Sequence, residues 1–171
     1  TDAIVGHMKT LTAEVIVKAL KVKPEMAAEL VAFYQNHDDA PVGAAAFSYS
    51  GLAFKNLAWS ELSEKAQAFG NDHVCILSGL YGIVTPESPI TDYRLDLVDR
   101  IFAKNIINKS VIDGLLQDVK TLYDCWTEKV TAYFQAEDWL LNLASKEYAK
   151  LVSHPRMVTV EFLELKEGVW K

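Results

Sequence analysis

The stretch HVCILSGLYGIVTPESPITDYRLDL, from His73 to Leu97, decides how the rest of the chain is arranged. Its first apolar residues, Val74 to Leu77, predict one short buried strand. Ser78 and Gly79 then open the turn SGLYG at 78–82, where two glycines favour a sharp change of direction and exposed backbone N–H groups. Because α/β proteins usually bind ligands where a strand ends in a glycine turn, we place the candidate site here.

An acid, an aromatic ring and a guanidinium group follow at Asp92, Tyr93 and Arg94. Arg94 is the strongest candidate to bind a phosphate or carboxylate group, because a guanidinium forms forked, charge-assisted hydrogen bonds. A purely structural ion pair between Arg94 and an aspartate explains the same residues equally well.

A second apolar run, Trp139 to Leu143, predicts a second buried strand with polar residues at its end. If the two strands are neighbours in one sheet, their polar ends share one pocket. Asn142 and Ser145 then add an amide and a hydroxyl group that suit an anion or the edge of a base. The alternative is that Ser145 only caps a short helix and Gly79 only forms a turn.

Aromatic and acidic side chains near these strand ends complete the candidate site. Tyr81 and Tyr148 can stack on bases, although partly buried packing aromatics need no such role. Glu147 is a candidate general acid or base if it is buried, whereas carboxylates on helix surfaces are commoner. No catalytic residue is assigned, because the spacing predicts no Ser-His-acid triad.

Three separated motifs occur in a fixed order, namely SGLYG at 78–82, YRL at 93–95 and NLASKEY at 142–148. Together they resemble the YaaA family of bacterial peroxide-stress proteins, and the resemblance covers roughly residues 46–171. Further matching positions are Tyr49, Gly51, Phe54, Leu57, Ser63 and Phe69 upstream, and Leu122, Tyr123, Trp126, Phe162, Gly168 and Lys171 downstream.

The resemblance implies a compact α/β (α+β) fold with a mixed central sheet flanked by helices, in one YaaA-like domain over residues 1–171. It also implies a cytoplasmic protein that binds DNA and limits oxidative damage, with a helix-hairpin-helix-like element and a positively lined cleft. Lys9 and Thr10 match the end of the family's Ser-Pro-Ala-Lys-Thr turn, so Lys9 joins the candidate binding residues. Relative to the family, we expect a shortened N-terminal third and no C-terminal segment.

Composition bounds the remaining possibilities. Half of the 171 residues are hydrophobic and 23% are charged, as in an ordinary soluble domain without a membrane span. The formal net charge of −6 argues against wholesale electrostatic wrapping of nucleic acid, although the segment 9–23 carries four lysines. Cys75 and Cys125 stand alone, which favours a reducing cytoplasm, and four histidines show no metal-ligand spacing. We therefore expect no metal and no cofactor.

Local patterns predict the secondary structure along the chain. Helices are expected at 13–20, from Pro24 onward, at 61–69, at 99–108 and over 110–134, and strands at 3–5, 73–77, 139–143 and 157–165, with a turn at 167–168 and a returning strand from 169.

Two other functions remain open. The first is an enzyme that acts on a nucleobase or nucleotide, with Lys9 as a nucleophile once burial lowers its pKa. The second is a non-catalytic interaction protein or fragment, whose apolar faces await a further segment or another copy.

Overall fold

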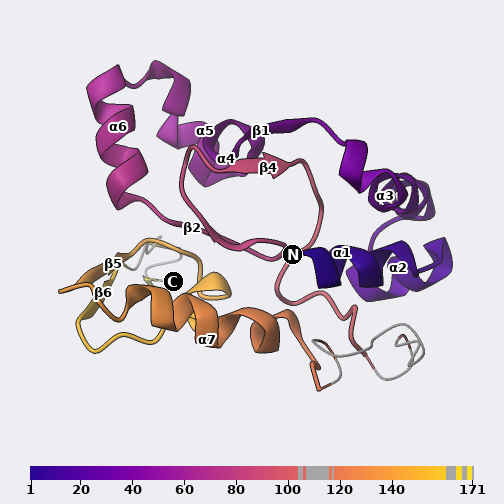
Figure 1. Cartoon of the computed structure of the whole chain (residues 1–171). Helices are drawn as coiled ribbons and strands as arrows, with labels where there is room; N and C mark the ends of the chain where they lie inside the picture. Colours follow the sequence, from indigo (N-terminus) through magenta and orange to yellow (C-terminus); the bar gives the residue numbers. More distant parts are fainter. Residues whose placement is uncertain (104–105, 107–115, 117, 161–164, 167–168, 171) are drawn as a thin grey trace.

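The chain contains helices and short strands in the computed structural model (Figure 1), which describes all residues except 104–105, 107–115, 117, 161–164, 167–168 and 171. The α-helices in the described part are α1 (Asp2–Lys9), α2 (Ala13–Leu20), α3 (Pro24–Gln35), α4 (Ala45–Ser48), α5 (Leu52–Leu57), α6 (Glu64–His73) and α7 (Leu122–Phe134). The described residues also form three 3₁₀ turns, namely η1 (His37–Asp39), η2 (Trp59–Glu61) and η3 (Tyr148–Leu151).

The strands are two or three residues long and form pairs. Antiparallel pairs join β1 (Val42–Ala44) to β4 (Pro89–Thr91), β2 (Ile76–Ser78) to β3 (Gly82–Val84), and β7 (Leu165–Lys166) to β8 (Val169–Trp170). The one parallel pair in the described part joins β5 (Leu140–Asn142) to β6 (Met157–Thr159). The predicted α/β class is confirmed, but the described strands form four separate pairs and not one central sheet.

The helices α2 and α3 pack against each other as a helical hairpin, and the prediction of both is confirmed. Apolar residues repeat every three or four positions, so Ile16 and Leu20 on α2 and Leu30 on α3 are buried against each other's helix. Lys21 ends α2 in the left-handed conformation, with φ of 53°, and Pro24 suits the first turn of α3. The turn between them is therefore only Lys21–Lys23.

The predicted strand at 3–5 is wrong, since these residues belong to α1. Ile4, Val5 and Met8 recur at helical spacing, and all three are buried in the core with α2 and α3. A run of three apolar residues cannot by itself distinguish a strand from the inner face of a helix.

Helix α6 is displaced from its predicted bounds. Its N-cap is Ser63, whose hydroxyl oxygen accepts the Ala66 N–H at 3.3 Å, and the helix continues to His73. Phe69 is exposed on this helix, while Gly70 is buried beneath the Trp59 ring. The strand predicted from His73 begins only at Ile76 for the same reason.

The predicted helix 99–108 is wrong where it is described, and residues 104–105 and 107–108 lie outside the described part. Asp99 to Ala103 form turns, because the Arg100 N–H donates to the Ala19 carbonyl of α2 and not to its own segment. In the predicted helix 110–134, residues 110–115 and 117 are not described. The helix α7 starts at Leu122, behind a capping box between Thr121 and Asp124.

The strand predictions near the C-terminus hold in part. Residues 140–142 and 157–159 are strands, and the hairpin of β7 with β8 is confirmed. The buried character expected of 139–143 is wrong, because Trp139, Leu141 and Leu143 are all exposed. Residues 161–164 of the predicted strand 157–165 lie outside the described residues.

The β2–β3 hairpin lies in the middle of the molecule, between the segment from α4 to α6 on one side and α7 on the other (Figure 1). Trp126 of α7 contacts the β2–β3 hairpin, because its indole N–H donates to the Gly79 carbonyl at 2.9 Å. The Trp126 ring also covers Gly82, whose φ of 78° favours glycine. Among the described helices, none has the length and hydrophobicity needed to cross a membrane.

Candidate functional site

Ser78 is a buried structural hydroxyl at the end of β2. Its side chain is 1% exposed, its oxygen accepts the Tyr81 N–H at 2.9 Å, and it lies 2.6 Å from the Tyr93 hydroxyl. The next residue, Gly79, has to be a glycine because the Leu95 carbonyl oxygen occupies the place that a Cβ atom would need. The turn is therefore held by contacts within the protein.

Tyr93 stands at the centre of a cluster of phenol groups. Its hydroxyl lies 3.2 Å from that of Tyr49, and its ring meets the rings of Tyr49 and Tyr81 edge to face. Burial raises the pKa of both Tyr49 and Tyr93, so these hydroxyls stay protonated at neutral pH and act as hydrogen-bond donors and acceptors.

Tyr81 connects this cluster to the N-terminal helices. Its hydroxyl accepts the Thr91 N–H at 3.0 Å and lies 2.8 Å from the Thr91 hydroxyl, which is 3.2 Å from Nε2 of His37. On the other side of the His37 ring, Nδ1 lies 3.6 Å from the Asp38 carboxylate. Asp38 in turn accepts a hydrogen bond of 2.7 Å from the Lys9 ammonium group.

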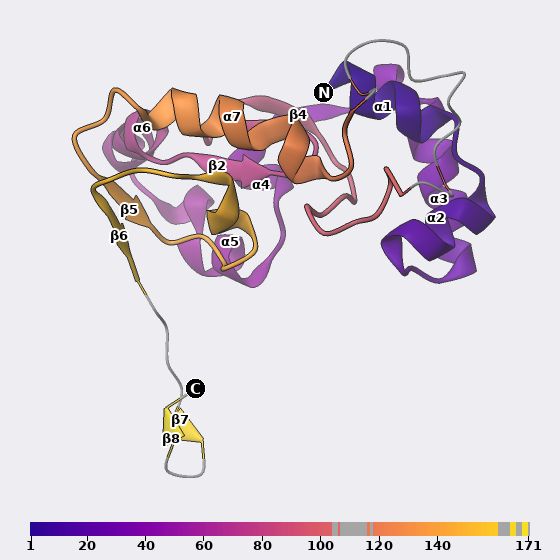
Figure 2. The same cartoon turned by 90° about the horizontal axis from the view of Figure 1, so that it is seen from below.

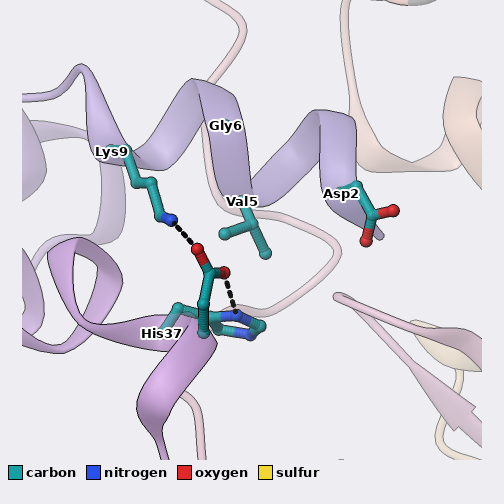
Figure 3. A pocket seen from close by; sticks show the side chains of 6 residues that line it. Asp2, Val5, Gly6, Lys9 and His37 are labelled. Atoms are coloured by element: carbon teal, nitrogen blue, oxygen red, sulfur yellow. Dashed lines mark hydrogen bonds and ion pairs between the residues drawn. The ribbon is translucent and has the colours of Figure 1, made fainter.

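Lys9, His37 and Asp38 line a hollow of about 280 Å³ between α1 and η1 (Figure 3), together with Asp2, Val5 and Gly6. The hydrogen bond and positive charge of Lys9 lower the pKa of Asp38, which is solvent-exposed. Lys9 is thus already paired with an anion at the edge of the hollow.

Arg94 lies in a second polar group with two aspartates. Its Nη1 atom is 2.7 Å from the Asp99 carboxylate and 3.1 Å from that of Asp96. Burial raises the pKa of Asp99, while the Asp96 N–H and the Arg94 guanidinium oppose the rise. The alternative of a structural Arg–Asp pair is therefore present, although with Asp96 and Asp99 and not with the exposed Asp92.

Tyr148 and Glu147 join this group from η3. The Tyr148 hydroxyl donates to Asp96 at 3.2 Å, and burial raises the pKa of Tyr148. Oε1 of Glu147 is buried and makes no hydrogen bond to any described residue. The structure thus forms two polar groups, one with Ser78, Tyr81 and Tyr93 and one in which Asp96 connects Arg94 to Tyr148.

Comparison with known proteins identifies the family of this chain. A family model described as "Peroxide stress protein YaaA" matches residues 1–171, and so includes the N-terminal helices that the motifs alone did not reach. The chain belongs to the YaaA family.

The similar proteins include UPF0246 proteins from the genus Francisella. The one from Francisella tularensis subsp. novicida is 31% identical over 183 aligned residues, which cover 98% of this chain and 66% of the relative. The one from Francisella philomiragia is 30% identical with the same coverage. The chain therefore spans just under two thirds of the length of these YaaA-family relatives.

Two of the residues that we placed in this site lie elsewhere. β5 pairs with β6 and not with β2, so the ends of the two strands are not neighbours in one described sheet. The Asn142 side chain is engaged locally, by accepting the Ala144 N–H and donating to Thr159, and Ser145 is exposed. The predicted pocket shared by Ser78 and Asn142 is wrong, since Ser78 is sealed inside.

Several members of the network were not singled out from the sequence, namely His37, Asp38, Thr91, Asp96 and Asp99. Their partners are up to 54 positions away in the chain, as for His37 and Thr91. Only Asp96 and Asp99 carried a local signal, because both lie within five residues of Arg94. Among the described residues, no group of three His, Cys, Asp or Glu side chains is placed to hold a metal ion.

Proposed function

We propose that this chain binds duplex DNA through the α2–α3 hairpin, as part of a cellular response that limits peroxide damage. The observation that carries the proposal is a group of exposed lysines around the turn of this hairpin, with Lys18 in the last turn of α2 and Lys21 and Lys23 in the turn itself. The helices α2 and α3 lie at one end of the molecule (Figure 1). Two contacting helices joined by a short basic turn match the helix-hairpin-helix-like element that the family resemblance implies.

Electrostatics favours this end of the molecule over the rest of an acidic chain. None of the three lysines forms an ion pair with a described residue, in contrast to Lys9, which is paired with Asp38. The first turn of α3 has no side-chain cap, and uncapped N–H groups at a helix N-terminus favour phosphate, but Pro24 has no N–H and the Glu25 carboxylate opposes an anion there, so the lysines carry the proposal. These lysines suit contact with the DNA backbone, which positions a protein without reading sequence.

The salt dependence of binding follows from the number of contacts. Three lysines that each neutralise one phosphate give a slope of about −2.7 in log affinity against log salt concentration. A fourfold rise in salt then lowers the affinity about 40-fold.

The test is fluorescence anisotropy with a short labelled duplex at several salt concentrations. The variant K18Q/K21Q/K23Q is expected to lose most of the affinity and about 2.7 of the slope. The matched control K55Q/K65Q/K146Q removes the same charge from exposed lysines on α5, on α6 and beside η3. Equal losses in both variants, or no binding by the unaltered chain, would contradict the proposal.

A second candidate function is chemistry on a nucleobase or nucleotide with Lys9 as the nucleophile. It is favoured by the hollow beside α1, where Asp38 lies between the Lys9 ammonium group and the His37 imidazole (Figure 3). Borohydride reduction in the presence of a duplex with an abasic site traps a lysine adduct if a Schiff base forms. An adduct that disappears in Lys9→Gln supports this function, and its absence from the unaltered chain excludes it.

A further inference from the structure

The parallel pair β5–β6 presents a continuous apolar face to solvent. Leu141 stands opposite Val158 in the register of the pair, and side chains two positions apart on a strand point to the same side. The face consists of Trp139, Leu141, Leu143, Val158 and Val160, whose exposed fractions are 62, 50, 62, 57 and 38%.

Such a face is unusual for this kind of sheet. Parallel strands are normally covered on both faces, and two strands alone are only marginally stable in water. In the part of the chain that the structure describes, neither β5 nor β6 has a second neighbour, and β7–β8 pairs only with itself. Figure 2 shows β5 and β6 at the opposite end of the molecule from α2 and α3, so this face is separate from the proposed DNA-binding hairpin.

We propose that this face binds an apolar polypeptide segment from the part of the YaaA-family sequence that has no match in this chain. The chain matches 66% of the length of its Francisella relatives, so about a third of the family's length is available as the occupant. In the Francisella relatives the unmatched residues are on the same polypeptide as the aligned strands and so have a high effective concentration, whereas a second copy loses translational and rotational freedom on binding. The segment is therefore favoured over a dimer through this face.

The experiment supplies the unmatched residues of the Francisella tularensis subsp. novicida relative as a separate polypeptide and titrates them into this chain by calorimetry. We expect a one-to-one complex, slower amide exchange at Leu141 and Val158, and about 100-fold weaker binding by L141D/V158D, because two opposed carboxylates would have to be buried. The control L52D/F69D places the same charges on the exposed apolar residues of α5 and α6 and keeps the affinity.

The outcomes separate the possible occupants. No complex, or a complex that L141D/V158D does not weaken, overturns the proposal. Light scattering that shows a dimer of this chain, dissolved by L141D/V158D, overturns it in favour of a second copy. If the aspartate variant unfolds, Trp139→Ala removes part of the face without adding charge. If the polypeptide is insoluble, amide hydrogen exchange is measured instead at the aligned strands of the full-length relative. Exchange there that is as fast as in this chain refutes the proposal that a segment covers the face.

Discussion

The hydroxyl pair of Ser78 and Tyr93 allows a direct test of whether Ser78 is structural. Ser78→Ala leaves the Tyr81 N–H without its acceptor and removes one of the two partners of the Tyr93 hydroxyl. Because a buried group left unsatisfied costs about 1–3 kcal/mol, and Tyr93 keeps its contact with Tyr49, we expect a loss of about 2 kcal/mol in the free energy of unfolding. For a domain of this size, that lowers the Tm by about 4–8 °C.

The assay is urea unfolding of a double-mutant cycle with Ser78→Ala, Tyr93→Phe and the double variant. The two side chains touch at 2.6 Å, so the combined loss should fall short of the sum of the single losses by about 1 kcal/mol. DNA binding by Ser78→Ala should be unchanged, since Ser78 is 1% exposed. Additive losses below about 0.5 kcal/mol, together with weakened binding, would refute the structural role.

Two further predictions concern the buried contacts of α1 and α7. His7 is 2% exposed, its Nε2 atom lies 2.7 Å from the Ile101 carbonyl, and burial lowers its pKa. The unfolded chain therefore binds the proton more readily, and stability that is fully present above about pH 6.5 should fall by up to about 1.4 kcal/mol per pH unit as the pH drops below that value. Denaturant unfolding at pH 7.5 and at pH 5.5 measures this loss of stability. The loss should be smaller in His7→Gln, and an equal loss in the unaltered chain and in His7→Gln would contradict the prediction. Trp126→Phe leaves the Gly79 carbonyl without its indole donor, so thermal unfolding should show a loss of about 1–3 kcal/mol, and an unchanged Tm would show that this hydrogen bond does not hold the hairpin.

The candidate site was only partly predictable. Ser78, Tyr81, Arg94 and Tyr148 follow from motifs that stand out locally, and the structure does place them in connected polar groups. Asn142 was expected beside them because two strands with polar ends suggested one sheet, yet β5 pairs with β6 alone. Strand pairing depends on which distant segments meet, and the apolar pattern of a strand does not name its partner.

The two helices of the basic hairpin and the family follow from the sequence alone, because proline and helical spacing act within a few residues and the motifs are contiguous. The sequence did not determine α1, since three apolar residues fit either a strand or a helix. Only the tertiary structure decided that Ser78 bonds Tyr93, that His37 reaches Thr91 and that β5–β6 keeps an open apolar face. Those contacts join segments that are distant in the chain. They are stabilised by tertiary packing, which a local sequence pattern does not specify.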